Sequence, residues 1–209
     1  MNGARAERLA IQGPSGPLEA IIEDPEREDT RYGLLCHPHP LHGGTMENKV
    51  VTTAAKALRE VGMPTLRFNF RGVGNSTGVY DEGRGETADA EAVAAWCAAR
   101  WPGRQPVIVG FSFGAYVALR LAQRIRASRL ITIAPPVTTF DFSGQPPPRC
   151  PWFIVQGDAD EIVDPIAVAA FVERLNPRPH MTIMPGAGHF FHGRLIELRG
   201  AVLDAIRGD

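Results

Sequence analysis

The pentapeptide Gly110-Phe111-Ser112-Phe113-Gly114 is the segment of this sequence with the clearest capacity for chemistry. It joins an apolar run at 106–111 to an amphipathic segment at 113–127, which predicts a sharp turn between a strand and a helix. Glycines two residues on either side of a serine tolerate the crowding of such a turn. The hydroxyl would stand at the carboxyl end of the strand and at the positive end of the helix. We therefore predict a nucleophile at Ser112; the alternative is an ordinary glycine-flanked turn with a serine helix cap.

A serine nucleophile needs a base, and the base needs a carboxylate to orient it. At a strand–helix elbow the expected chain order is serine, acid, histidine, and three histidines follow Ser112. His189 comes just after the last predicted strand, at the sheet edge where the serine should project, and is the predicted base. His192 is the reserve candidate or a solvated residue. His180 begins the last strand and is expected at the surface.

The orienting carboxylate should follow the strand before the last one, where a loop carries four acidic residues. Asp164 is expected to cap the next helix, and Asp158 is expected to shape the turn after the strand. Asp160 lies near the middle of the loop and can reach across to the histidine. Glu161 is the less well placed alternative. The loop therefore predicts Asp160 as the acid.

A tetrahedral intermediate needs an oxyanion hole, whose donors each contribute about a hundredfold or more in rate. One donor is expected to be the backbone N–H of Phe113, the residue after the nucleophile. The other is expected from the early loop at 37–44, His-Pro-His-Pro-Leu-His-Gly-Gly. Its prolines have no N–H, which leaves His39 or, failing that, Leu41.

The same loop also suggests a metal site, because His37 and His39 would point to one side of an extended segment. No HExxH motif or carboxylate cluster accompanies them, and the prolines favour a stiff loop wall, so no metal is predicted. The three cysteines are an odd number at wide spacing, which fits neither a disulfide framework nor a CxxC zinc pattern. Cys36, within a predicted strand, is expected to be a buried thiol.

A glycine-rich segment at 68–78, Phe-Asn-Phe-Arg-Gly-Val-Gly-Asn-Ser-Thr-Gly, resembles a dinucleotide-binding loop. Thr77 replaces the third glycine of that motif, however, and no helix follows at once. A dinucleotide oxidoreductase is therefore disfavoured and no cofactor is predicted. The segment is expected to be a rigid loop bordering the active site.

The composition indicates a globular protein. The 209 residues are 44% hydrophobic and 22% charged, which excludes a wholly disordered chain. Lys and Arg number 22 and Asp and Glu 23, giving a net charge of −1, so neither nucleic acid nor a membrane is an expected partner. No segment approaches the roughly 18 apolar residues of a membrane span, which predicts a cytoplasmic protein.

The elements that must position these residues begin with two short strands at 8–12 and 18–23. Short apolar runs then alternate with amphipathic segments, the pattern of a mostly parallel sheet with helices on both faces. The predicted strands are 33–36, 64–70, 106–111, 130–134, 152–156 and 181–184, and the predicted helices are 49–61, 87–100, 113–127, 166–175 and 190–207. The Pro-rich segment 135–151 is too short for a folded lid, so residues 1–209 are predicted to be one α/β domain with a minimal cap.

Together these residues resemble the α/β-hydrolase superfamily, and more narrowly its small lidless bacterial branch of serine hydrolases and esterases. The motifs that carry the resemblance are His-Pro-His-Pro with Gly-Gly at 37–44, Arg-Gly-x-Gly-x-Ser at 71–76 and Gly-x-Ser-x-Gly at 110–114. The resemblance covers essentially the whole chain. It implies Ser112 as nucleophile, Asp160 as acid and His189 as base, on an α/β-hydrolase fold with antiparallel N-terminal strands.

The expected activity is hydrolysis of a small-molecule carboxylic ester or thioester. Short acyl chains are expected, because a chain with almost no cap should have a shallow, open pocket. The alternatives are a peptidase of the same superfamily and a non-catalytic binding protein of this fold. A pure binder has no need of a strained elbow with an acid and a histidine in matching order. The triad specifies the reaction class, whereas the pocket specifies the acyl and leaving groups.

Overall fold

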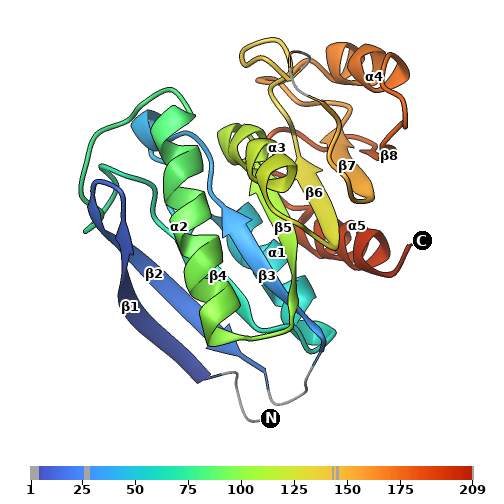
Figure 1. Cartoon of the computed structure of the whole chain (residues 1–209). Coiled ribbons are helices and arrows are strands. Elements are labelled where there is room, and N and C mark those ends of the chain that lie inside the picture. Colours follow the sequence, from blue (N-terminus) through green and yellow to red (C-terminus); the bar gives the residue numbers. More distant parts are fainter. Residues whose placement is uncertain (1–4, 26–28, 143, 145, 209) are drawn as a thin grey trace.

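The computed structural model describes residues 5–25, 29–142, 144 and 146–208, and its strands form one mixed sheet (Figure 1). The sheet has eight strands in the order β1-β2-β4-β3-β5-β6-β7-β8. The strands are β1 (Arg5–Gly13), β2 (Gly16–Asp24), β3 (Arg31–Cys36), β4 (Thr65–Phe68), β5 (Gln105–Phe111), β6 (Arg129–Ile133), β7 (Trp152–Gly157) and β8 (His180–Met184). The helices are α1 (Lys49–Glu60), α2 (Arg84–Arg100), α3 (Phe113–Arg124), α4 (Pro165–Glu173) and α5 (Leu195–Arg207), with a short 3-10 helix η1 (Pro40–His42).

Strand directions follow the sequence pattern. The first two strands form an antiparallel hairpin, and β2 pairs antiparallel with β4. All other neighbours, from β4 through β3 to β8, are parallel. The carboxyl ends of the parallel strands therefore lie along one edge, and the loops that leave them meet there.

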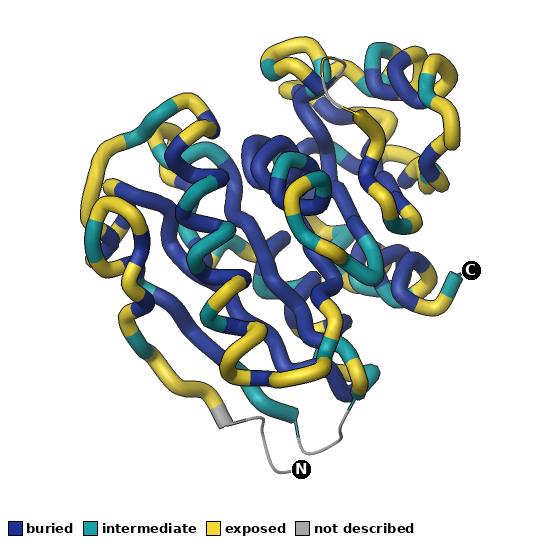
Figure 2. Tube along the Cα trace, viewed as in Figure 1, coloured by how far each residue is buried: buried dark blue, intermediate teal, exposed yellow. Residues whose placement is uncertain are grey.

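Helices cover both faces of this sheet, as predicted. Apolar side chains of α2, α3 and α4 share one core cluster with the strands, and those of α1 and α5 share the other. Figure 2 shows the central strands buried along most of their length. The predicted mostly parallel α/β sheet with antiparallel N-terminal strands is thus confirmed. Among the described residues, no helix is both long and apolar enough to span a membrane.

The helices differ from their predicted ranges mainly at their ends. α2 begins at Arg84, three residues before the predicted start, because the Glu86 carboxylate accepts hydrogen bonds from the Gly83 and Asp81 N–H groups, both 2.8 Å. α5 begins at Leu195 rather than at 190. Residues 189–194 form turns instead, with Phe191 at φ 53°. The Phe191 ring is fully buried, and its burial outweighs the strain of that backbone.

The segment between β6 and β7 forms a minimal cap. Its described residues contain no helix or strand. Phe142 is buried in it, with its ring 5.6 Å from Tyr116 and 5.9 Å from Phe171. The described residues of the segment therefore pack onto α3 and α4 and form no separate lid.

Candidate active site

The elbow between β5 and α3 is as sharp as the pentapeptide predicts. Ser112 has φ 53° and ψ −121°, a conformation that is strained for a residue with a side chain. A Cβ on Gly110 would lie 2.1 Å from the carbonyl oxygen of Gly114, and one on Gly114 would lie 2.3 Å from the carbonyl oxygen of Cys36. Both positions therefore require glycine. The Ser112 side chain makes no capping hydrogen bond to α3, which removes the simpler explanation of the motif.

Ser112, His189 and Asp160 lie in hydrogen-bond contact, although they come from three different loops. His189 Nε2 is 3.1 Å from Ser112 Oγ, and His189 Nδ1 is 2.9 Å from Asp160 Oδ2. An ionised carboxylate can only accept, so Nδ1 carries the proton and Nε2 is left to accept from the hydroxyl. This is the arrangement in which a histidine can deprotonate a serine. The structure thus brings together the three residues predicted as a triad.

Asp160 is held as an anion by four donors. Its Oδ1 accepts from the backbone N–H groups of Ile162, at 2.9 Å, and Val163, at 2.7 Å. Its Oδ2 accepts from His189 and from Gln156 Nε2, the latter at 3.0 Å. Burial disfavours the charge, but the hydrogen bonds from His189, Val163 and Ile162 outweigh it and lower the pKa of Asp160. The carboxylate therefore stays ionised beside the imidazole.

The other acidic residues of this loop have different partners. Asp164 caps α4 by accepting from Ile166 N at 2.9 Å, as predicted. Asp158 Oδ1 accepts from Gly186 N at 2.6 Å and so joins the loops after β7 and β8. Glu161 Oε2 accepts from the backbone N–H of His189 at 3.1 Å. Glu161 thus holds the histidine's main chain, whereas Asp160 contacts its ring.

Neither of the other downstream histidines contacts the serine. His192 is exposed, with its ring 5.9 Å from that of Phe190. His180 begins β8, is exposed, and stacks on Phe153 with ring centroids 4.9 Å apart. His189, by contrast, is only 2% exposed.

The first histidine of the early loop is a structural link. His37 Nδ1 lies 2.6 Å from the Pro38 carbonyl oxygen, and its Nε2 accepts from Phe70 N at 2.9 Å. Burial lowers the pKa of His37 to about 3, so the ring is neutral. Both nitrogens are occupied, which leaves no lone pair for a metal. Among the described residues, no group of three or more His, Cys, Asp or Glu side chains is placed to hold a metal ion.

The two residues predicted to supply oxyanion donors lie near the serine: Phe113 follows it in the chain, and His39 lines the same cavity. Phe113 is the first residue of α3, where a backbone N–H has no acceptor within the helix. The Leu41 N–H donates to His39 Nδ1 at 3.2 Å, and the Leu41 side chain is 67% exposed. Because the Leu41 donor is engaged and His39 lines the cavity beside Ser112, the geometry favours His39 as the second donor. Its role stays a prediction.

The glycine-rich segment at 68–78 forms a loop with many hydrogen bonds to other parts of the chain. The Glu19 carboxylate accepts from Asn75 N at 3.1 Å and from Asn69 Nδ2 at 2.8 Å. A Cβ on Gly74 would lie 2.5 Å from this carboxylate. A protein anion therefore lies where a dinucleotide phosphate would have to bind. The loop borders the site through Phe70, whose ring packs 5.7 Å from that of Phe113.

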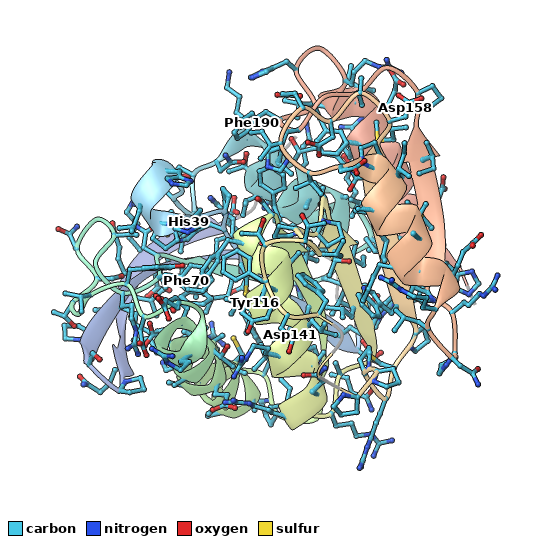
Figure 3. All side chains as sticks on the ribbon, turned by 90° about the horizontal axis from the view of Figure 1, so that it is seen from above. His39, Phe70, Tyr116, Asp141, Asp158 and Phe190 are labelled. Atoms are coloured by element: carbon cyan, nitrogen blue, oxygen red, sulfur yellow. The ribbon has the colours of Figure 1, made fainter. Side chains whose placement is uncertain are left out.

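Ser112 opens into a small cavity of about 130 Å³. It is lined by Pro38, His39, His42, Gly43, Gly44, Asn48, Ser112, Ile162, His189 and Phe190. Figure 3 looks down on this edge of the sheet, with His39 and Phe70 at the left, Phe190 above them and Asp158 at the upper right. Larger cavities of about 350 and 470 Å³ are lined by other segments, including 122–127 and 177–180, and contain none of the three triad side chains. Cys36, at the end of β3, is a buried free thiol. Burial raises the pKa of this thiol, as expected for an inert buried cysteine.

Sequence reasoning missed two side chains that support this site. Gln156 donates to Asp160, and Glu161 accepts from the main chain of His189. The sequence signal for Gln156 is a polar amide near the end of the otherwise apolar strand β7. No comparable signal distinguishes Glu161 from its acidic neighbours, because its contact depends on how two loops approach each other.

Comparison with known proteins identifies the family. Residues 34–152 match the model of the alpha/beta hydrolase family. An uncharacterized protein of Rickettsia prowazekii is 40% identical over 207 residues, covering 94% of this chain and 87% of the relative. The chain belongs to the alpha/beta hydrolase family.

Two solved structures extend this result. An a/b serine hydrolase without lid from Xanthomonas campestris is 46% identical, with a TM-score of 0.94, over 99% of this chain and 96% of that one. An alpha-beta serine hydrolase homologue from Coxiella burnetii is 50% identical, with a TM-score of 0.92, over 94% of this chain and 95% of that one. The predicted resemblance to lidless alpha/beta hydrolases is confirmed, and these relatives support hydrolase activity in general terms.

Proposed function

We propose that this alpha/beta hydrolase is a serine hydrolase that cleaves carboxylic esters or thioesters with short acyl chains. The observation that carries the proposal is the continuous contact from Asp160 through His189 to Ser112. The ionised carboxylate favours the imidazole tautomer with its proton on Nδ1. The name of the Xanthomonas campestris relative, a serine hydrolase without lid, supports the same reaction class.

The mechanism follows from these contacts. Ser112 Oγ attacks the carbonyl carbon while His189 Nε2 takes the hydroxyl proton, and Asp160 holds the imidazole in place and stabilises its charge. The backbone N–H groups of Phe113 and His39 bind the oxyanion. His189 then gives its proton to the departing alcohol or thiol. A water molecule, deprotonated by the same histidine, hydrolyses the acyl-enzyme, and Ser112 recovers its proton. The mechanism requires no cofactor.

The acyl group is proposed to be short because the space beside the nucleophile is small. The cavity holds about 130 Å³, roughly the volume of four water molecules. The ring of His39 packs 5.1 Å from Phe113 and 4.9 Å from Tyr80, and this aromatic packing fills the neighbouring space. Ile162 and Phe190 also line the cavity and present apolar surface there.

A series of p-nitrophenyl esters tests this size limit. We expect kcat/KM to be highest for acetyl to butyryl esters and to fall about tenfold or more at twelve carbons, because the longer chain lies outside the cavity. Initial rates below the critical micelle concentration of each ester measure the trend. An optimum at long chains would contradict the proposed substrate size and leave the reaction class intact.

A fluorophosphonate probe separates an enzyme from a binding protein of this fold. We expect the native chain to be labelled at Ser112, because such probes phosphonylate a serine that a base activates, with loss of fluoride. Labelling should be lost in Ser112→Ala and strongly slowed in His189→Gln, as read by intact-mass spectrometry. His192→Gln is the matched control, since that exposed histidine does not contact the serine. An unlabelled native protein would support the non-catalytic alternative, and cleavage of aminoacyl amides in preference to esters would support a peptidase.

A further inference from the structure

Gln156 is a polar residue on the core-facing side of a buried strand, where an apolar residue is expected. It is the fifth residue of β7 and is fully buried. Side chains alternate along a strand, so Gln156 shares a face with Trp152 and Ile154, which belong to the core cluster under α2, α3 and α4. Its Oε1 is buried and has no hydrogen-bond partner among the described residues. An unsatisfied buried oxygen destabilises a fold, so packing does not explain this residue.

The hydrogen bonds of the amide nitrogen, Nε2, explain why a glutamine occupies this position. Gln156 Nε2 donates to Asp160 Oδ2 at 3.0 Å, and to the Gly157 carbonyl oxygen at 3.1 Å. Asp160 Oδ2 is also the oxygen closest to His189 Nδ1, at 2.9 Å. One carboxylate oxygen therefore receives the imidazole N–H on one side and the Gln156 amide on the other.

Gln156 and the carboxylate that it binds lie on segments of different rigidity. Gln156 lies in a strand that is paired with β6 on one side and β8 on the other. Asp160 lies in the loop that follows this strand. The backbone N–H groups of Ile162 and Val163 fix Oδ1, and they come from the same loop as the carboxylate. Gln156 is thus the contact that ties the acid to the sheet.

We propose that Gln156 is a positioning residue of the triad: it holds Asp160 Oδ2 in line with His189 Nδ1 and moderates the basicity of the imidazole. The inference rests on the proposed function. A carboxylate that loses one donor concentrates its charge on the remaining one, which stabilises the imidazolium and makes His189 harder to deprotonate. A carboxylate that loses its anchor also spends less time in the productive orientation.

These effects predict a particular kinetic signature for Gln156→Leu. We expect kcat for a short-chain ester to fall about tenfold and KM to change less than about twofold, because Gln156 does not touch the substrate. The acidic limb of the kcat/KM profile should move to higher pH by about half a unit, since it reports protonation of His189 in the free enzyme. Gln156→Met should show the same changes in kcat and in the pH profile, and it replaces Gln156→Leu in the experiment if the leucine variant does not fold.

The matched control is Thr132→Val on the neighbouring strand β6. Thr132 is also fully buried, and its Oγ1 accepts from Trp152 Nε1 at 2.9 Å, away from the triad. This variant loses a buried hydrogen bond without touching Asp160. We expect it to lower the unfolding midpoint and to leave the pH profile unchanged.

Proton NMR measures the hydrogen bond between His189 Nδ1 and Asp160 directly, without substrate. The His189 Nδ1–H, bonded to a carboxylate, should give a far-downfield resonance that is absent in His189→Gln and displaced in Gln156→Leu. A folded Gln156→Leu or Gln156→Met protein with the native resonance and the native pH profile would overturn the proposal and leave Gln156 a structural residue. Because the resonance needs no turnover, a failure of the proposed hydrolase function would show separately, as a native protein that neither cleaves esters nor reacts with the probe.

Discussion

Replacing Ser112 by alanine is expected to lower kcat/KM for a short-chain ester by about 10⁵-fold or more. The substitution removes the Oγ that lies 3.1 Å from His189 Nε2 and keeps the Cβ that the elbow already accommodates. Without the hydroxyl the histidine has no nucleophile to deprotonate and no acyl-enzyme can form. The activity that remains should come from the oxyanion donors and substrate binding, about 10³-fold over the uncatalysed reaction. Hydrolysis of p-nitrophenyl butyrate at high enzyme concentration measures the loss.

Ser128→Ala is the matched control for this experiment. The Ser128 hydroxyl donates to the Pro106 carbonyl oxygen at 2.9 Å, at the end of the sheet opposite the proposed site. We expect its kcat/KM to remain within about twofold of the native value. A Ser112→Ala protein that has a native unfolding midpoint and keeps most of the esterase activity would place the nucleophile elsewhere, and the proposed triad mechanism would be wrong.

Much of the site is predictable from sequence because parallel strands bring their carboxyl ends to one edge. Ser112 follows β5, Asp160 follows β7 and His189 follows β8, so their convergence depends only on each strand being recognised. Each of these strands is predictable from local sequence, because it is an apolar run that ends in a glycine at the turn or in a polar loop. The elbow is predicted by Gly110 and Gly114, because a Cβ at either position would collide with backbone atoms.

Contacts between distant segments are what the sequence does not reveal. The Glu19 carboxylate occupies donors of a glycine-rich loop that lies 56 residues further along the chain, so the resemblance to a dinucleotide loop could be rejected only on weaker grounds. The sequence predicts a helix from residue 190, whereas the structure has turns at 189–194. Local rules could not predict these turns, because they place Phe191 at a positive φ, which is unfavourable for a residue with a side chain. Only the core that buries its ring makes that turn stable. Gln156 is only four residues from Asp160, but a lone polar amide in an apolar strand does not by itself name its partner.

Replacing Asp160 by asparagine is expected to lower kcat/KM by about 10³–10⁴-fold at neutral pH. The two backbone N–H groups that donate to Oδ1, from Ile162 and Val163, will hold the amide oxygen at that position. The amide nitrogen then faces His189 Nδ1 and donates to it. The imidazole proton must move to Nε2, so that nitrogen can no longer accept the proton of Ser112. The loss therefore arises mainly from the wrong tautomer, and the substitution also removes the acceptor of the Gln156 amide, whose Nε2 donates to Oδ2 in the native site.

Three neighbouring carboxylates make this experiment specific. Asp158→Asn, Asp164→Asn and Glu161→Gln each remove one negative charge from the same loop, but none of these side chains contacts the imidazole ring, and an asparagine still caps a helix well. We expect Asp158→Asn and Asp164→Asn to keep kcat/KM within about threefold of native, and Glu161→Gln, which loosens the His189 main chain, to lose about tenfold at most. If the loss depended on loop charge alone, all four variants would fall together. If Asp160→Asn stayed near native while Glu161→Gln lost most activity, the acid would be Glu161, and the hydrogen bond that we read as orienting the base would serve only to close the loop.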